Sequence, residues 1–326
     1  MKTARLTLAA PCKVNLHLRV KELRADGCHE LESIFLALAF GDTLDVEVFD
    51  EPGPVVLSRE YRIGRGAEGP GGGPGRIGGG AELPPPEKDL AYRAAALFRE
   101  TTGFEKALAL RLVKRVPLGA GLGGGSSDAA AVLRGLDALA GTALSRKALA
   151  SMAGALGSDV PFFLEPGAAF VSGRGELIRP LPVPEKLRVV LVNPGFPSDT
   201  AGAFRRLDRD REERDRRGQA EAAAGGAAAD PEALIAALGR DPGSWPYGND
   251  FLPLFLKEGG EAYRRIIGDL KALGADFAGL SGSGSTCFGI FTGGGSAERA
   301  ARNLAERWNF IVLTFPLASS GMGVLQ

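Results

Sequence analysis

The chain has 326 residues, of which 44% are hydrophobic and 24% charged, and its 39 lysines and arginines balance 39 aspartates and glutamates. These fractions are those of an ordinary globular protein, and the length allows two cores. The lack of excess positive charge argues against a protein that binds nucleic acid over a broad surface. Glycine is the anomaly, because 47 glycines are about twice the usual share. They have no three-residue period, which excludes collagen.

The cysteines and apolar stretches indicate the compartment. Cys12, Cys28 and Cys287 are odd in number and form no Cys-x-x-Cys pair, so they support neither a disulfide framework nor a structural zinc site. The apolar stretch near Leu6 is shorter than the core of a secretion signal, and no stretch reaches the roughly 20 apolar residues of a membrane span. We expect a cytoplasmic protein with no membrane partner.

Periodicity predicts a mixed order of elements in the first half of the chain. Alternating or continuous apolar runs predict strands at residues 6–10, 31–40, 44–49 and 108–112, and helical spacing predicts helices at residues 90–101, 127–139 and 146–156. This order is typical of an α+β domain.

The second half reads as a small α/β sandwich. The pattern predicts strands at residues 168–171, 187–192, 286–291 and 310–315, and helices at residues 261–273 and 297–308. We place the boundary between the halves near residue 167.

Two segments differ from the rest in composition. Residues 62–86 are rich in Gly and Pro and carry too little apolar surface to offset the entropy of ordering them, so we expect a flexible surface insertion. Residues 205–230 begin with a dense run of charges and end in Ala/Gly repeats. We expect this second insertion to be solvated, with partial helix at most.

The strongest local signal is a glycine-rich run between a predicted strand and a predicted apolar helix, Pro117-Leu118-Gly119-Ala120-Gly121-Leu122-Gly123-Gly124-Gly125-Ser126-Ser127. Backbone N–H groups of glycines can wrap an anion, and the start of a helix adds unsatisfied donors and a positive dipole end. The run therefore predicts a phosphate-binding loop. Ser126 or Ser127 could cap the helix and turn a hydroxyl toward a phosphate or a metal ion.

Other phosphate loops fit this run less well. A Walker A loop needs Gly-Lys followed by Ser or Thr, and the run has no lysine; the protein-kinase signatures are missing too. The spacing of Gly119, Gly121 and Gly124 matches a dinucleotide fingerprint. However, the predicted helix leads to Gly141-Thr142 and another helix, instead of a strand that ends in an acidic residue.

Together with other segments, the loop resembles the ATP-binding motif of the galactokinase, homoserine kinase, mevalonate kinase and phosphomevalonate kinase superfamily. Residues 10–16 are similar to the first motif of that superfamily and residues 280–286 to its third. Within it, four segments are similar to the 4-diphosphocytidyl-2-C-methyl-D-erythritol kinase family, namely residues 13–16, 24–31, 157–162 and 193–195.

The resemblance implies a two-domain small-molecule kinase fold. Residues 1–167 would form an N-terminal ATP-binding domain like domain 2 of ribosomal protein S5, and residues 168–326 a ferredoxin-like α/β sandwich on the substrate side. The implied reaction is phosphorylation by ATP, with Mg²⁺, of the 2-hydroxyl of a cytidine diphosphate-linked methylerythritol, on the non-mevalonate route to isoprenoid precursors. The implied partner is thus a small molecule, and the chain would be a monomer or a homodimer.

The resemblance also implies roles for individual residues. Asp159 would accept the hydroxyl proton, and Lys13 would be its electrostatic partner. The implied substrate-binding residues are Asn15 near the methylerythritol, His29 at the cytosine, Cys28, and Phe204 as an aromatic face. The implied support loop of the active site is Ser281, Gly282, Ser283 and Gly284.

Two positions depart from the family pattern. Cys28 stands where the family usually has a tyrosine that stacks on cytosine, which removes a contact worth roughly 1–3 kcal/mol in nucleic-acid complexes. Either cytidine binds more weakly or Phe204 compensates. Asp89 stands where the family commonly has asparagine, which leaves the adenine contact open.

Three other functions remain open from the sequence. The chain could be another small-alcohol kinase of the superfamily, acting on mevalonate or homoserine. The glycine loop could also belong to a dinucleotide-binding oxidoreductase or to a nucleotide-binding module without catalysis.

Overall fold

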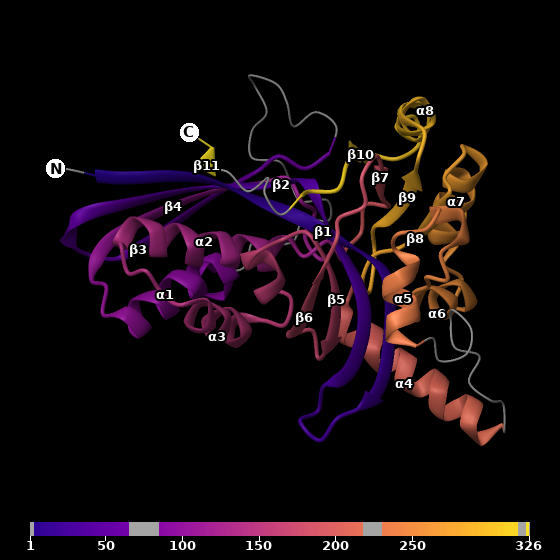
Figure 1. Cartoon of the computed structure of the whole chain (residues 1–326), viewed down its shortest axis with the longest axis horizontal. Coiled ribbons are helices and arrows are strands. Elements are labelled where there is room, and N and C mark those ends of the chain that lie inside the picture. Colours follow the sequence, from indigo (N-terminus) through magenta and orange to yellow (C-terminus); the bar gives the residue numbers. More distant parts are fainter. Residues whose placement is uncertain (1–2, 65–84, 218–229, 319–323, 326) are drawn as a thin grey trace.

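The computed structural model describes residues 3–64, 85–217, 230–318 and 324–325, and these build two β-sheets with helices packed on them (Figure 1). The larger sheet contains seven described strands: β1 (Thr3–Leu23), β2 (His29–Pro52), β3 (Val55–Tyr61), β4 (Lys106–Lys114), β5 (Ala168–Gly173), β6 (Leu177–Leu181) and β11 (Val324–Leu325). Its order is β11-β1-β2-β4-β3, with β5 paired to β2 and β6 to β5. The long strands β1 and β2 cross the whole molecule and join its two halves.

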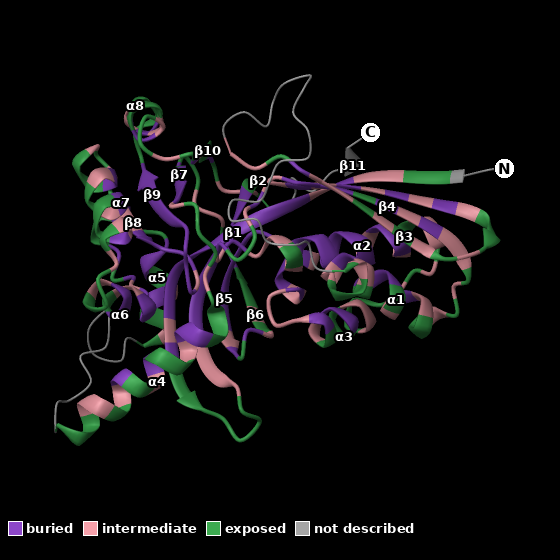
Figure 2. Ribbon diagram, turned by 180° about the vertical axis from the view of Figure 1, so that it is seen from behind, coloured by how far each residue is buried: buried purple, intermediate pink, exposed green. Residues whose placement is uncertain are grey.

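The first core lies between this sheet and three helices, α1 (Leu90–Thr102), α2 (Gly124–Ala140) and α3 (Arg146–Leu156). Alternate strand residues such as Leu8, Leu44 and Leu110 are buried against the helices. Burying such side chains stabilises the fold by about 1.5–3 kcal/mol each. Figure 2 shows the buried strands beneath helices whose outer faces are exposed.

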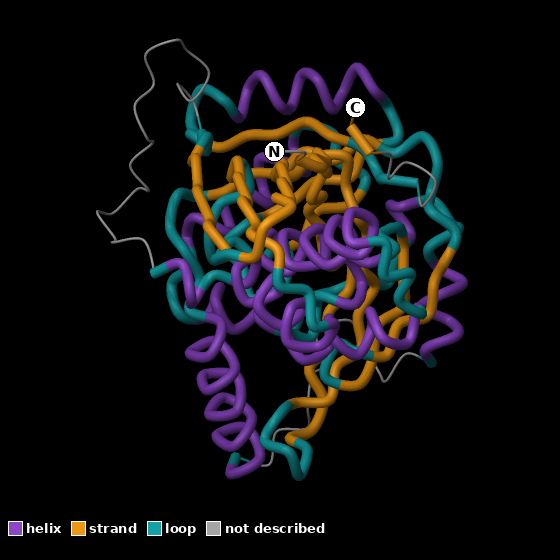
Figure 3. The backbone as a smooth tube through the Cα atoms, turned by 90° about the vertical axis from the view of Figure 1, so that its left-hand side faces the viewer, coloured by secondary structure: helices purple, strands orange, loops and turns teal. Residues whose placement is uncertain are grey.

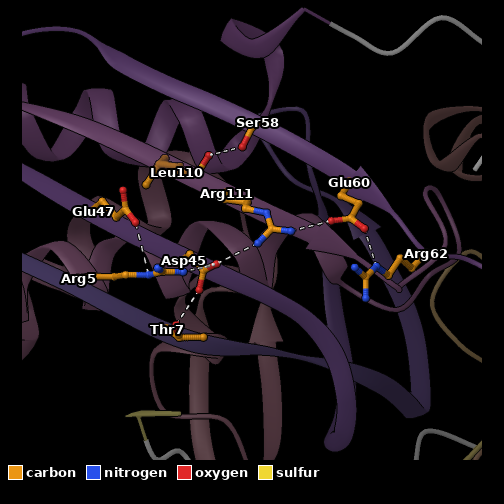
Figure 4. A network of polar contacts seen from close by, with 9 residues as sticks. All are labelled: Arg5, Thr7, Asp45, Glu47, Ser58, Glu60, Arg62, Leu110 and Arg111. Carbon is orange, nitrogen blue, oxygen red and sulfur yellow. Dashed lines mark hydrogen bonds and ion pairs between the residues drawn. The ribbon is translucent and has the colours of Figure 1, made fainter. Parts of the chain in front are cut away.

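The residues between these apolar positions form a polar network on β1 to β4 (Figure 4). Asp45 pairs with Arg5 at 3.2 Å, and Arg111 donates to Glu60 at 3.0 Å. Both arginines are more than half exposed. Because exposed ion pairs contribute at most about 1 kcal/mol each, the apolar side of the sheet is what holds this half together.

The second half forms the predicted sandwich. Its four described strands are β7 (Arg188–Asn193), β8 (Phe277–Leu280), β9 (Cys287–Phe291) and β10 (Phe310–Thr314), arranged in the antiparallel order β10-β7-β9-β8. The helices α7 (Glu261–Ala272) and α8 (Gly294–Leu304) pack on this sheet. When the four strands are numbered 1 to 4 along the chain, their order across the sheet is 4-1-3-2. This is the ferredoxin-like arrangement, and it confirms the predicted fold class.

Several short elements escaped the sequence prediction: β3, β6, β8, β11, the helices α5 (Pro231–Ala237) and α6 (Phe251–Lys257), and the 3-10 turns at Pro86–Lys88, Pro161–Leu164 and Pro242–Ser244. Elements this short show too little of a period to be recognised. The two strands predicted at residues 31–40 and 44–49 are one strand, β2, which passes both cores.

Most described residues of the charge run are exposed or half-buried, as expected, but the expectation of partial helix at most is wrong for this part. Residues 205–216 belong to α4 (Thr200–Arg216), a regular helix that Asp199 caps through the backbone N–H of Gly202. Asp210 is buried and accepts from Lys257 on α6 at 2.6 Å, so tertiary contacts help to stabilise a helix made mostly of charged residues. In Figures 1 and 3, α4 extends from the body alongside the β1–β2 hairpin. Residues 218–229, and residues 65–84 of the other insertion, lie outside the described part.

The proposed boundary at residue 167 falls inside the larger sheet. β5 pairs with β2 from Leu31↔Gly173 to Leu36↔Ala168, and β6 pairs with β5. We therefore propose a boundary after β6, in the segment that leads into β7, in place of the one predicted at residue 167. Within the described residues, no helix is long and apolar enough to cross a bilayer.

Acid should weaken this fold through His17, a buried residue of β1 whose Nδ1 accepts from the backbone N–H of Gly248 at 3.2 Å. Burial lowers the pKa of His17 from its usual 6.5 to about 4. Between these values the unfolded chain binds a proton that the folded chain does not, so stability falls as pH drops from about 6.5 to about 4, by roughly 1.4 kcal/mol per unit. We expect His17→Asn to flatten the fall in the free energy of unfolding over this range, measured by urea denaturation. An unchanged slope would contradict this role.

Candidate active site

A cleft of about 610 Å³ lies where the two halves meet, and it gathers residues far apart in the sequence. The glycine loop, the centre of β1, the turn before Pro161, the β8–β9 loop and the start of α4 all line it. From the predicted site, Lys13, Asn15, Asp159, Phe204, Gly282 and Ser283 are among the lining residues.

The glycine loop turns sharply because three of its glycines have left-handed backbones. Gly119, Gly121 and Gly123 have φ values of +61°, +74° and +71°, a region that side chains other than glycine rarely enter. The third of them is the N-cap of α2, with no side-chain cap hydrogen bond. The prediction that a serine caps this helix is therefore wrong. Ser126 lines the cleft, whereas Ser127 is buried and its Oγ has no hydrogen-bond partner among the described residues.

The β8–β9 loop, which carries Ser281 to Gly284, supports the glycine loop from behind. Ser281 Oγ donates to the carbonyl of Gly121 at 2.8 Å, and the backbone N–H of Thr286 donates to Ala120 at 3.1 Å. Ser283 in turn bonds to α4 through Thr200 and accepts from Ser198. The β8–β9 loop thus holds the glycine loop in shape through these hydrogen bonds.

A side chain at Gly121 should disrupt this contact. A Cβ there would lie 2.1 Å from the carbonyl oxygen of Ser281 and 2.8 Å from that of Gly284. We expect Gly121→Ala to raise the KM for ATP and to lower the free energy of unfolding, measured by chemical denaturation. Gly103→Ala is the matched control, since Gly103 has φ +69° but no atom within 4 Å of its Cβ position. It should show the backbone strain alone, about 1–2 kcal/mol, and equal losses in both variants would refute the steric argument.

Lys13 and Asp159 form the centre of the site. Lys13 is 3% exposed on β1, and its Nζ lies 3.4 Å from Oδ2 of Asp159 and 4.5 Å from the ring centroid of Phe35. Asp159 sits in the turn between α3 and the following 3-10 turn, with about a third of its side chain exposed to the cleft. The buried ammonium and the accessible carboxylate suit a base that faces a bound substrate.

Asn15 orients the lysine. Its Oδ1 accepts from Lys13 Nζ at 2.6 Å, its Nδ2 donates to Ser33 Oγ at 2.9 Å, and its backbone N–H donates to Ser281 Oγ at 3.2 Å. One residue thereby links Lys13 to the support loop.

His29 and Phe204 meet where the main cleft borders a neighbouring one. Their rings stack at 5.1 Å between centroids with an angle of 24°, and His29 Nε2 lies 2.7 Å from Oδ1 of Asp208 on α4. Phe204 lines the main cleft, whereas His29 lines a neighbouring cleft of about 500 Å³ beneath α4. Cys28 is half-buried and is not among the lining residues of either cleft; its backbone N–H donates to Asp26 at 3.0 Å.

Sequence reasoning missed a buried ionic cluster beside the phosphate loop. Lys114, at the end of β4, contacts the carboxylates of both Asp42 and Asp128, and all three residues are buried. Asp42 also accepts from the backbone N–H of Val116, directly before the loop, at 2.8 Å. Burial raises the pKa of Asp128, the ammonium of Lys114 opposes this rise, and the nearby Asp42 carboxylate adds to it. The carboxylates lie 72 and 14 residues from the lysine, so nothing in the local sequence indicates the cluster.

Comparison with known proteins finds similarity to kinases. Residues 89–167 match the GHMP kinases N terminal domain and residues 230–309 the GHMP kinases C terminal domain. The 4-diphosphocytidyl-2-C-methyl-D-erythritol kinase of Anaeromyxobacter dehalogenans is 43% identical, covering 93% of this chain and 86% of that protein. The enzyme of the same name from Treponema pallidum is 37% identical, covering 94% and 97%.

The chain belongs to this kinase family. A crystal structure of a 4-(cytidine 5'-diphospho)-2C-methyl-D-erythritol kinase, 33% identical, superimposes with a TM-score of 0.70 over 95% of this chain and 99% of that one. A homoserine kinase from Cytophaga hutchinsonii, 19% identical, superimposes with a TM-score of 0.67 over 98% and 97%, which shows a shared fold alone. As a member of the 4-diphosphocytidyl-2-C-methyl-D-erythritol kinase family, the protein is a kinase with ATP as its co-substrate.

Proposed function

We propose that the protein transfers the γ-phosphoryl group of ATP to the 2-hydroxyl of 4-diphosphocytidyl-2-C-methyl-D-erythritol, a step toward isoprenoid precursors, in the cytoplasm. The observation that carries this proposal is the Lys13–Asp159 pair beside the glycine loop, in a chain 43% identical to a kinase named for that substrate. Phosphoryl transfer depends mainly on positioning and on stabilising charge, and this cleft offers groups for both.

The glycine loop, Asp159 and Lys13 each have a part in the proposed reaction. The glycine loop and the start of α2 hold the phosphates of ATP with backbone N–H groups. Asp159 orients the hydroxyl and accepts its proton as the oxygen attacks the γ-phosphorus, while ADP leaves. The ammonium of Lys13, 3.4 Å from the Asp159 carboxylate, orients that carboxylate and stabilises the negative charge that develops nearby.

Mg²⁺ fits the residues of this cleft. The described residues hold no group of three or more His, Cys, Asp and Glu side chains that could bind a metal. Mg²⁺ with a nucleotide, however, is held mostly by phosphates and water, with one or two protein ligands. The hydroxyl of Ser126, which lines the cleft, is the group that would contact the ion. The ion would neutralise phosphate charge.

The substrate-binding residues divide the cleft into two ends. We assign Asn15 to the methylerythritol end, and His29 with Phe204 to the cytosine end. Because His29 already stacks on Phe204, the histidine ring covers one face of the phenylalanine. The His29–Phe204 pair partly replaces the aromatic surface that Cys28 does not supply. Cytosine would bind at the edge of this pair.

A coupled assay of ADP release with purified protein tests the function. We expect turnover with the diphosphocytidyl alcohol and none above background with mevalonate, homoserine or uncytidylylated methylerythritol. Activity with one of the simpler alcohols would instead favour another small-alcohol kinase.

A further inference from the structure

The β5–β6 turn brings an arginine to the wall of the main cleft. Arg174 is exposed and lines the cleft together with Ser158 and Asp159. The flanking Gly175 has φ +121°, and a Cβ at that position would lie 2.9 Å from the Cβ of Ser158. The arginine therefore stands on a tight turn that is packed directly against the turn of the proposed base.

Charge balance distinguishes Arg174 from the other basic residues of the cleft. The described lining holds three basic side chains, Lys13, Lys114 and Arg174. Lys13 pairs with Asp159, and Lys114 contacts two buried carboxylates. Within the described part of the chain, the guanidinium of Arg174 has no ion pair or hydrogen bond; only its backbone N–H is engaged, by Glu176 at 2.7 Å.

The strand register fixes the position of the turn that carries this cation. Gly173 pairs with Leu31 on β2, two residues from His29, and its N–H donates to the carboxylate of Glu30 at 3.0 Å. On its other side the turn meets Ser158. The turn that carries Arg174 therefore adjoins both the turn of Asp159, the proposed base, and the strand that begins at His29, the proposed cytosine-binding residue.

We propose that Arg174 binds the diphosphate that links the cytidine to the methylerythritol, an inference that rests on the proposed function. A substrate that spans from Asp159 to His29 must place its two phosphates between them, and these anions need a cation that is not already neutralised. A guanidinium suits this task, since its planar fork donates two parallel hydrogen bonds to phosphate oxygens. Arg174 is a specificity-determining residue, because a simple alcohol without the diphosphate gains nothing from it.

Steady-state kinetics of Arg174→Gln tests the proposal. We expect the KM for the diphosphocytidyl alcohol to rise about 10- to 100-fold, as for loss of charge-assisted hydrogen bonds, with kcat and the KM for ATP within about twofold of wild type. Arg174→Lys should recover part of the affinity. Arg179→Gln is the matched control, because Arg179 lies on β6 of the same hairpin, pairs with Glu232 and is not among the lining residues of the cleft. It should leave both constants unchanged.

The outcomes separate this inference from the proposed function. Wild-type protein that is inactive with the diphosphocytidyl alcohol refutes the proposed function itself. Active wild type with an unchanged substrate KM in Arg174→Gln overturns the inference alone. A rise in the KM for ATP instead would assign the guanidinium to the triphosphate, and equal effects in Arg174→Gln and Arg179→Gln would reduce Arg174 to a structural residue; both overturn the proposal.

Discussion

Replacing Asp159 with asparagine is expected to lower kcat by about 10²–10⁴-fold, the usual contribution of a positioned acid or base. The amide keeps the size of the side chain but cannot accept the hydroxyl proton, and it no longer pairs with Lys13, whose Nζ lies 3.4 Å away. Because the carboxylate is part-exposed in a surface turn, the fold should tolerate the change. The KM for ATP should move little, since we assign the phosphates of ATP to the glycine loop.

The measurement is kcat by coupled ADP release, with thermal unfolding as a check on folding. Glu165→Gln is the control, because Glu165 lies six residues further on, is 61% exposed and pairs with Arg146 on the surface. It should retain wild-type kcat. Near-normal turnover of a folded Asp159→Asn protein would refute the assignment of Asp159 as the base.

The second large effect concerns stability. Lys114→Met should lower the free energy of unfolding by about 3–5 kcal/mol, the usual cost of removing one partner from a buried ion pair. Without the ammonium, the carboxylates of Asp42 and Asp128 remain buried close to one another. The loss should reach the active site as well, because Asp42 holds the N–H of Val116 at the start of the phosphate loop.

Urea denaturation at neutral pH checks this expectation. Lys106→Met is the matched control on the same strand, since Lys106 is 45% exposed and pairs with Asp50; it should cost no more than about 1 kcal/mol. Adding Asp42→Asn and Asp128→Asn to Lys114→Met should restore part of the stability. If Lys114→Met were no worse than Lys106→Met, the cluster would not stabilise the loop.

The features that could be predicted from the sequence are those that depend on local residue patterns. Periodicity located α3 at Arg146–Leu156, and the two-domain fold class followed from the motifs. The glycine loop could be recognised because its backbone conformation demands glycine at Gly119, Gly121 and Gly123. Such signals depend only on residues that are neighbours in the chain, so they can be recognised in a single sequence.

The features that escaped prediction depend on contacts between distant segments. The helix α4 was missed because most of its residues are charged and carry little apolar surface. The burial of Leu207 and the contact of Asp210 with Lys257 on α6 support it, and both depend on distant segments. Lys114 looked like the end of an ordinary strand, since its partners come from β2 and α2. Arg174 carried no signal, because a lone arginine in a glycine turn acquires meaning only from the cleft beside it.

A single-turnover experiment with γ-labelled ATP tests the central claim most directly. We predict that wild-type protein transfers the label to the 2-hydroxyl of the diphosphocytidyl alcohol, located by NMR of the isolated product, and that Asp159→Asn leaves the label on ATP. Label that appears in inorganic phosphate, on the protein or on an alcohol without cytidine would contradict the account.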